Sequence, residues 1–399
     1  MVPESVVAPM GDPLSWKGRV AGAVDVVLIS AGHLMSDVYA SYIVTLLPLW
    51  VHLFDLSFSA AGFLVFVRSA SMALFQPVGG YVADRTTRQL FPVGLLVVAL
   101  MMSSVGLAPS YSIVILLVLI ATMGHSLFGP QAASEARRSS GSFRGLGLSI
   151  YLTGGWVGAA SGPLIIASLV DKVGLQRSWL MLLPGLVLCI LLFIKFAAPA
   201  PRPQKAGSSA GILAALCSGP TLALAAVLLL RGGADTGIVS FLPILVAQRG
   251  GSLITIGATV SVFKLAGATG AIVAGSLSDR LNWKPYMVLS LVLAPVLLYG
   301  ALQSSGWLAL VFVALLGAAL LSSSVYTLDM AQSLLPDQMS TATGLTFSLM
   351  ILGGGLVTWC EGLLADLWGV QAALLVIGVA LPLSAAAATL GIRARVHAT

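Results

Sequence analysis

Apolar segments of about 20 residues recur along this chain from near its start to near its end, and each can cross a hydrocarbon core about 30 Å thick. Only 9% of the 399 residues are Asp, Glu, Lys or Arg, whereas soluble domains contain roughly a quarter. A soluble fold is therefore excluded. Because a segment in lipid has to satisfy its own backbone hydrogen bonds, the sequence predicts an all-α membrane protein.

Hydropathy predicts twelve membrane-spanning helices. The first and seventh are longer than one crossing requires. Each contains a stretch with glycine and polar residues, at 32–37 and 231–237, so we expect bent helices around a cavity. The predicted spans lie near 20–50, 57–82, 91–108, 112–136, 145–170, 179–196, 211–247, 253–278, 286–303, 308–334, 342–367 and 370–392.

The basic residues indicate how the chain is oriented. With both termini in the cytoplasm, 14 of the 20 Lys and Arg residues lie inside, and only Lys172, Arg177 and Arg249 lie in outside loops. This is the positive-inside pattern of a multi-pass protein of the bacterial inner membrane. It accounts for the net charge of +6 without a nucleic-acid partner. Residues 1–18 lack the apolar core of a cleavable signal peptide.

The chain contains an internal duplication. Pro48 in L-P-L matches Pro243 in L-P-I, and Asp84 in G-Y-V-A-D-R matches Asp279 in G-S-L-S-D-R, both at an offset of 195 residues (243 − 48 and 279 − 84). We therefore expect two pseudo-symmetric six-helix bundles with a substrate site between them near mid-membrane. The predicted parts are a tail at 1–19, a bundle at 20–196, a Pro/Gly/Ser/Ala-rich linker at 197–211, a bundle at 212–392 and a tail at 393–399.

The loop after the second span contains Gly80-x-x-x-Asp84-Arg85-x-x-Arg88, with a degenerate second copy that ends in Asp279 and Arg280. It resembles the cytoplasmic loop motif of the major facilitator superfamily. The resemblance implies the major facilitator fold and a gate in which the glycine allows close approach and the Asp accepts bonds from a neighbouring helix N-terminus. The partner would be span eleven, near 341–344, and the latch would stabilise the outward-open state. Ordinary loop charge that sets topology is the alternative.

Span five carries Gly154, Gly155, Gly158, Gly162 and Pro163 at helical spacing, so one of its faces is nearly bare. This pattern resembles the span-five motif of antiporters in the superfamily, although small-residue packing between the halves also explains it. The segments 30–37, 76–85, 128–131 and 149–164 together resemble the fosmidomycin-resistance branch of drug exporters. That resemblance implies export.

Ionisable residues within spans are functional candidates, because they are costly at bilayer depth without a cavity or partner. His33 and Asp37 lie one helical turn apart, and we predict that they couple transport to protons; a purely structural pair is the alternative. Asp329 and Glu361 are further candidates for the proton site.

Two cations, Arg68 and Lys264, occupy nearly matching positions of the two repeats, which predicts an anion site between them. The alternative is internal salt bridges, such as Arg68 with Asp37 or Lys264 with Asp329. Arg231 and Asp235 are four residues apart, so we expect a structural ion pair there.

Several other polar and aromatic side chains in the spans are candidates to line the substrate cavity, although such aromatics more often serve packing. They are Gln131, Tyr151, Trp156, Tyr326 and Trp359.

Together these features predict a secondary transporter that works by alternating access, with proton-coupled efflux of a small organic anion or drug-like molecule as the favoured activity. One alternative is a proton symporter that imports a carboxylate or phosphonate, and another is a receptor or lipid flippase on the same fold. We expect a monomer without a cofactor. No catalytic or metal-binding sequence motif is present, and the three cysteines are not in C-x-x-C spacing.

Overall fold

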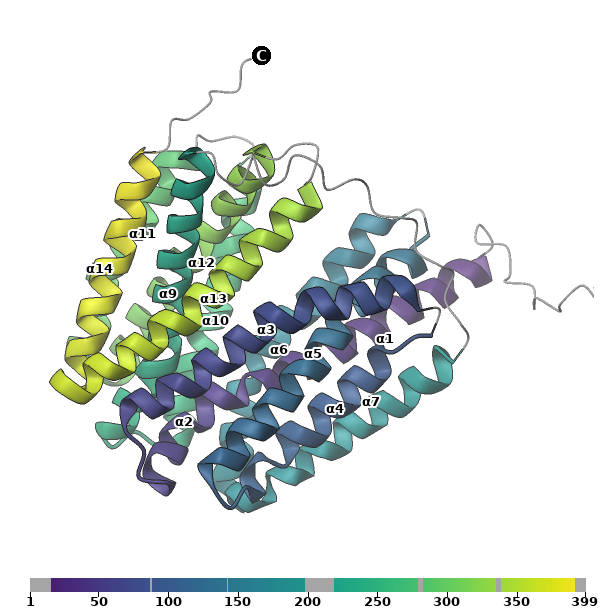
Figure 1. Cartoon of the computed structure of the whole chain (residues 1–399), viewed down its shortest axis with the longest axis horizontal. Coiled ribbons are helices and arrows are strands. Elements are labelled where there is room, and N and C mark those ends of the chain that lie inside the picture. The colour runs from purple at the N-terminus through teal and green to yellow at the C-terminus, as the bar shows by residue number, and fades with distance from the viewer. Residues whose placement is uncertain are drawn as a thin grey trace, which may run out of the picture.

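The computed structural model describes residues 16–86, 88–141, 143–197, 219–278, 283–334 and 339–391, which form helices and, within these ranges, no strand (Figure 1). The C-terminal tail, residues 1–15, and the predicted linker after residue 197 lie outside the described ranges.

The first unit consists of six spans, three of them divided into consecutive helices. Their bounds are α1 Trp16–Ala40, α2 Tyr42–Leu53, α3 Phe58–Arg85, α4 Phe91–Ser103, α5 Tyr111–Ser139, α6 Arg144–Val173 and α7 Leu182–Lys195, with 3-10 turns η1 Val105–Leu107 and η2 Leu175–Met181.

The second unit repeats this order with one helix for each span. Its helices are α9 Gly219–Gln248, α10 Leu253–Ser278, α11 Trp283–Gln303, α12 Gly306–Leu334, α13 Met339–Trp368 and α14 Val370–Gly391.

The helices bear out the twelve predicted crossings. In the described part of the chain, eleven segments are long and apolar enough to span a membrane, and the shorter apolar segment Phe91–Leu107 corresponds to the predicted third span. The protein is therefore a multi-pass membrane protein.

The first span breaks at a different place from the one predicted. Helix α1 runs without interruption through 32–37, and the break lies at Ser41, between α1 and α2. The Ser41 hydroxyl donates to the Val38 carbonyl at 2.6 Å, and the Thr45 hydroxyl donates to the Ser41 carbonyl at 3.1 Å. Such side-chain bonds compete with the backbone ladder and bend a helix. Helix α9 is also continuous through 231–237.

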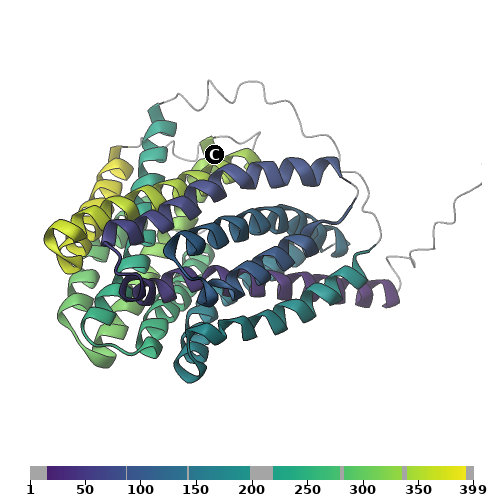
Figure 2. The same cartoon turned by 60° about the horizontal axis from the view of Figure 1, so that its bottom comes forward.

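The two units meet along two helix pairs, α3 with α13 and α6 with α10 (Figures 1 and 2). Glycines allow the close approach. A Cβ on Gly355 of α13 would lie 2.5 Å from Cβ of Ser69 on α3, and one on Gly257 of α10 would lie 2.7 Å from the Pro163 carbonyl oxygen of α6. At these places in the seam, small residues let the helices of the two units approach closely.

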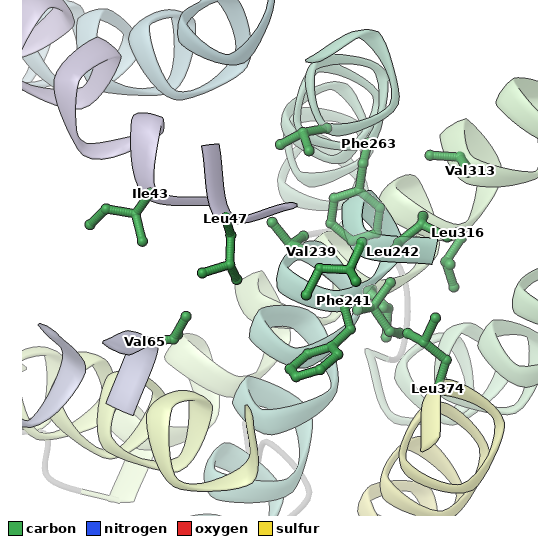
Figure 3. Close-up of a cluster of buried hydrophobic side chains, with 14 of the residues drawn as sticks. Ile43, Leu47, Val65, Val239, Phe241, Leu242, Phe263, Val313, Leu316 and Leu374 are labelled. Carbon is green, nitrogen blue, oxygen red and sulfur yellow. The ribbon is translucent and has the colours of Figure 1, made fainter. Parts of the chain in front are cut away.

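A single hydrophobic cluster spans both units (Figure 3). Leu47 of α2 points toward Val239 and Leu242 of α9, and Val65 of α3 lies nearby. These residues lie toward the end of the molecule at which α3 begins. We call this the Phe58 end, and the opposite end, at which α3 stops, the Arg85 end.

Within the first unit, α6 packs closely on α1 through its glycine face. Gly154 lies against the carbonyl of Ser30, and Gly158 lies against the carbonyl of Leu34. Gly162 continues the contact at Val38. Any side chain at these positions would meet backbone, which cannot move aside cheaply.

We predict that Gly158→Ala destabilises the protein by about 1–3 kcal/mol, because the added methyl group overpacks the α1–α6 contact. The melting temperature of the purified protein measures the effect. Gly145→Ala, on the same helix but with no atom within 4 Å of the position that its methyl group would occupy, is the control. It should be neutral or slightly stabilising, since Ala favours helix more than Gly does. Equal melting temperatures for the two variants would contradict the packing argument.

Candidate functional site

The first unit gathers ionisable side chains around Asp37 of α1. His33 lies one turn earlier, and its Nε2 is 3.5 Å from Oδ2 of Asp37. Both side chains are largely but not fully buried, at 14% and 22% exposure. A carboxylate and an imidazole at this distance can share or exchange a proton.

Tyr151 of α6 fixes the orientation of His33. The two rings stack with centroids 4.1 Å apart, and Nδ1 of His33 is 2.8 Å from the Tyr151 carbonyl oxygen. The Tyr151 hydroxyl donates to the Gly129 carbonyl at 3.1 Å. Gly155 leaves the space that the pair occupies, because a Cβ there would lie 2.7 Å from both His33 Nε2 and Asp37 Oδ2. Tyr151 was predicted to line the substrate cavity, but its contacts make it the platform for the His33 ring.

Arg68 of α3 and His125 of α5 extend this group. Both line a cavity of about 20 Å³, large enough for one water molecule. Nδ1 of His125 lies 2.9 Å from the Ser36 hydroxyl. His125 was missed in the sequence, although the rule that singled out His33, an ionisable residue inside an apolar span, applies equally to it.

The second unit carries a comparable pair. Lys264 of α10 lies 3.6 Å from Oδ1 of Asp235 on α9. The cation from the second span of this unit therefore faces a carboxylate from the first span. Lys264 pairs with Asp235 rather than with Asp329, the partner considered from sequence.

The predicted ion pair between Arg231 and Asp235 is wrong, because each side chain has a different partner. Nε and Nη2 of Arg231 donate to the Leu320 carbonyl at 3.1 and 3.0 Å, and Nε also donates to the Ser323 hydroxyl at 2.7 Å. Arg231 is 1% exposed, so it has to satisfy its donors within the protein. It joins α9 to α12, and its role is structural as predicted.

Glu361 of α13 is fully buried, and neither of its carboxyl oxygens has a hydrogen-bond partner among the described residues. The carboxyl group lies against Gly237 of α9. An ionised carboxylate without a partner is costly in such a place. The position suits a group that carries a proton.

Gln131 of α5, a candidate to line the substrate cavity, makes three hydrogen bonds around the start of α4. Its Oε1 accepts hydrogen bonds from the backbone N–H groups of Leu90 at 2.6 Å and Phe91 at 2.8 Å. Its Nε2 donates to the Arg88 carbonyl at 3.0 Å. Gln131 thus satisfies the free donors at the start of α4 and fixes the end of the loop that follows α3.

The remaining aromatic and acidic candidates are dispersed. Trp359 stacks on Phe66 in the seam, with ring centroids 5.2 Å apart, so it joins the two units. Trp156 of α6 and Asp329 of α12 are exposed. Tyr326 lines an apolar groove of about 750 Å³ between α10 and α12, away from the Lys264–Asp235 pair.

Of the loop motif, the structure describes the surroundings of Gly80, Arg85 and Arg88. A Cβ on Gly80 would have no atom within 4 Å, and Arg85 lies over the ring of Tyr81 on its own helix, 4.1 Å from the centroid. Arg88 is exposed. The side chain of Asp84 and the second copy at Asp279 and Arg280 lie outside the described residues.

Comparison with known proteins identifies the family. The sequence profile of the Major Facilitator Superfamily matches residues 29–358, and a second match covers residues 224–398. The chain belongs to the Major Facilitator Superfamily. It is therefore a transporter and not an enzyme.

Curated relatives of this transporter include drug-resistance proteins. It is 28% identical over 351 residues to the fosmidomycin resistance protein of Escherichia coli, covering 85% of each chain. It is 27% identical over 306 residues to the multidrug resistance protein MdtG of Enterobacter lignolyticus, covering 72% of this chain and 70% of that protein.

Solved structures share the fold of this transporter at low sequence identity. The nucleoside transporter NupG matches with a TM-score of 0.76 at 13% identity, over 93% of this chain and all (100%) of that one. A bacterial homologue of the human lysosomal transporter Spinster, in an inward-facing and unoccupied conformation, matches with a TM-score of 0.72 at 18% identity, over 95% of each chain.

We predict that Gln131→Met lowers the melting temperature, since losing its hydrogen bonds leaves buried backbone donors unsatisfied at about 1–3 kcal/mol each. Methionine has nearly the same length, so packing is kept. Solute affinity, measured by calorimetry well below the melting temperature, should stay within about twofold of wild type. That change is small, because about 1.4 kcal/mol of binding free energy corresponds to a tenfold change in Kd. An unchanged melting temperature together with lost affinity would instead indicate that Gln131 contacts the substrate.

Proposed function

We propose that this transporter exports a small organic anion or drug-like molecule and couples that movement to protons. The observation that carries the proposal is that each unit holds a carboxylate on its first span and a cation on its second, Asp37 and Arg68 in one unit and Asp235 and Lys264, which are 3.6 Å apart, in the other. All four residues lie in membrane-spanning helices. An ionisable side chain is costly there, so each one is a functional candidate by default.

The cations supply the affinity for an anionic solute. A carboxylate or phosphonate that enters between the units replaces the acidic partner of Arg68 or Lys264 as the counter-ion. Arginine binds such groups with two parallel hydrogen bonds, whereas lysine acts as a point charge, so the two units would hold different parts of the solute.

The protons are carried by the acidic groups. His33 and Asp37 form the first station, and Glu361, which has no described partner, is the second candidate. Asp329 is exposed and is the weaker candidate. Coupling requires that protonation favour one conformer over the other, since a proton that binds both equally shifts nothing.

The described contacts support an inward-facing state. The units are joined by hydrogen bonds at the Phe58 end, whereas at the other end a Cβ on Gly80 would meet no atom within 4 Å and the described contact of Arg85 is with Tyr81 of its own helix. The positive-inside pattern assigns the Arg85 end to the cytoplasm. The cytoplasmic gate would therefore be open.

Export is supported by the relatives, because the curated proteins that resemble this chain include a fosmidomycin resistance protein and a multidrug resistance protein. The close α1–α6 packing through glycines agrees with the antiporter-like pattern of span five.

The Lys264–Asp235 pair also favours a second candidate function, proton symport of an anion. A proton that binds Asp235 would neutralise the carboxylate and free the ammonium group of Lys264 for the solute. Proton and anion would then bind together, and import of a carboxylate or phosphonate would follow.

Flux in proteoliposomes loaded with solute separates the two functions. If the protein exchanges solute for protons, an acidic outer buffer accelerates loss of solute from the lumen, because the two species move in opposite directions. If it is a symporter, an acidic lumen accelerates loss. Both results are independent of the orientation of the protein in the vesicle.

We predict that Arg68→Ala and Lys264→Ala abolish the thermal shift that organic anions produce. A ligand at 100 times its Kd stabilises the native state by about 2.7 kcal/mol, and this shift should vanish without the cations. Lys195→Ala is the control, since Lys195 pairs with Asp25 at 3.0 Å at the Arg85 end of the first unit. Shifts like those of wild type in both test variants would refute the anion site.

We predict that Asp37→Asn removes the response of solute flux to a pH gradient while exchange of labelled for unlabelled solute continues. The uncharged amide no longer binds a proton but fills the same space. Asp55→Asn is the control, because Asp55 is exposed and its φ of 49° is one that Asn tolerates. Flux of Asp37→Asn that still follows the gradient would assign the proton to another group, such as Glu361.

A further inference from the structure

Two hydrogen bonds at the Phe58 end join the units, and both end on Asp366. Its Oδ1 accepts from the backbone N–H of Phe58 at 2.7 Å, and its Oδ2 accepts from that of Ser59 at 3.0 Å. Asp366 lies in the last turn of α13, and Phe58 and Ser59 are the first two residues of α3. One carboxylate of the second unit therefore caps a helix of the first.

The start of α3 depends on this carboxylate. The first four N–H groups of a helix have no partner inside the helix. Ser57 satisfies the third, since its hydroxyl oxygen accepts from Ala60 at 3.1 Å, and the Ser57 carbonyl accepts from Ala61 at 3.1 Å. The first two N–H groups are left to Asp366. The positive end of the α3 dipole adds to the attraction.

Asp366 is poorly placed for its own helix. An acidic residue in the last turn of a helix faces the negative end of that helix dipole and is unfavourable there. The stabilisation that it brings to the protein therefore comes from α3, and it is lost when the two units separate at this end.

Two further contacts bring Asp366 within reach. Gly362 lies against the Phe58 carbonyl and Cα of Ser59, so α13 approaches the start of α3 without a side chain between them. One turn earlier, Trp359 stacks on Phe66. These contacts align the last turns of α13 with the first turns of α3.

We propose that Asp366 is the positioning residue that holds the Phe58 end closed, and that opening this end requires its two hydrogen bonds to break. The proposal rests on alternating access, but not on the identity of the solute or on proton coupling.

At the opposite end of the same helix pair, it is α3 that has an acidic residue, Asp84, in its last turn. The helices α3 and α13 are antiparallel neighbours, and each has an Asp in its last turn. Alternating access closes one end as it opens the other, and Asp366 would hold closed the end at which its two hydrogen bonds lie.

Spin labels across the Phe58 end test the proposal in lipid nanodiscs. Leu53→Cys at the end of α2 and Leu367→Cys on α13 are exposed positions in different units, and the native cysteines are replaced first. Double electron–electron resonance then gives the populations of short and long label distances. With Asp366→Ala the ratio of long to short distances should rise about tenfold, as expected for the loss of charge-assisted hydrogen bonds. Asp366→Asn, which keeps the shape and one acceptor oxygen, should give a smaller rise.

Asp171→Asn is the matched control. Asp171 lies 195 residues before Asp366, at the equivalent place in the first repeat and at the same end, but in the described residues it makes no hydrogen bond or ion pair. Its distance distribution should match that of wild type. The proposal is overturned if Asp366→Asn, folded by circular dichroism, gives the same distribution as Asp171→Asn. No gradient or solute is present, so this outcome is separate from any failure of the proposed transport activity.

Discussion

A charged group inside a membrane-spanning bundle must find its counter-charge or hydrogen bonds within the protein, and this requirement organises the structure. His33 and Asp37 pair with each other within α1, whereas Arg231 donates to a backbone carbonyl of α12. Lys264 and Asp235 bridge α9 and α10. In each case the partners belong to one six-helix unit, so the unit keeps its polar contacts when it moves as a body.

The surface between the units follows from the same requirement. Glycines on α13 and α10 meet small side chains and backbone of α3 and α6. Such contacts let helices of different units pack closely without a polar partner across the seam. The two hydrogen bonds that Asp366 accepts at the Phe58 end then stabilise one orientation of the units relative to another.

The sequence could predict the spans and the duplication because both depend on local quantities. Apolar length fixes a crossing, and a constant offset between Pro48 and Pro243 reveals a repeat. Residue spacing along one helix also brought His33 and Asp37 together correctly. The same spacing rule failed for Arg231 and Asp235, because Arg231 donates to α12 and Asp235 pairs with Lys264 of α10. The hydrogen bonds of Gln131 could not be predicted, because its partner, the start of α4, lies about 40 residues away in sequence.

Composition and periodicity by themselves therefore determined that this chain crosses the membrane in two similar halves, and which charges lie at bilayer depth. They could do so because water-to-lipid transfer depends on residue type alone. Only the tertiary structure decided how those charges pair, that His125 lies against Ser36, and that Asp366 reaches across to α3. Contacts of that kind depend on the distance and direction between atoms of different helices, and no spacing within a sequence encodes them.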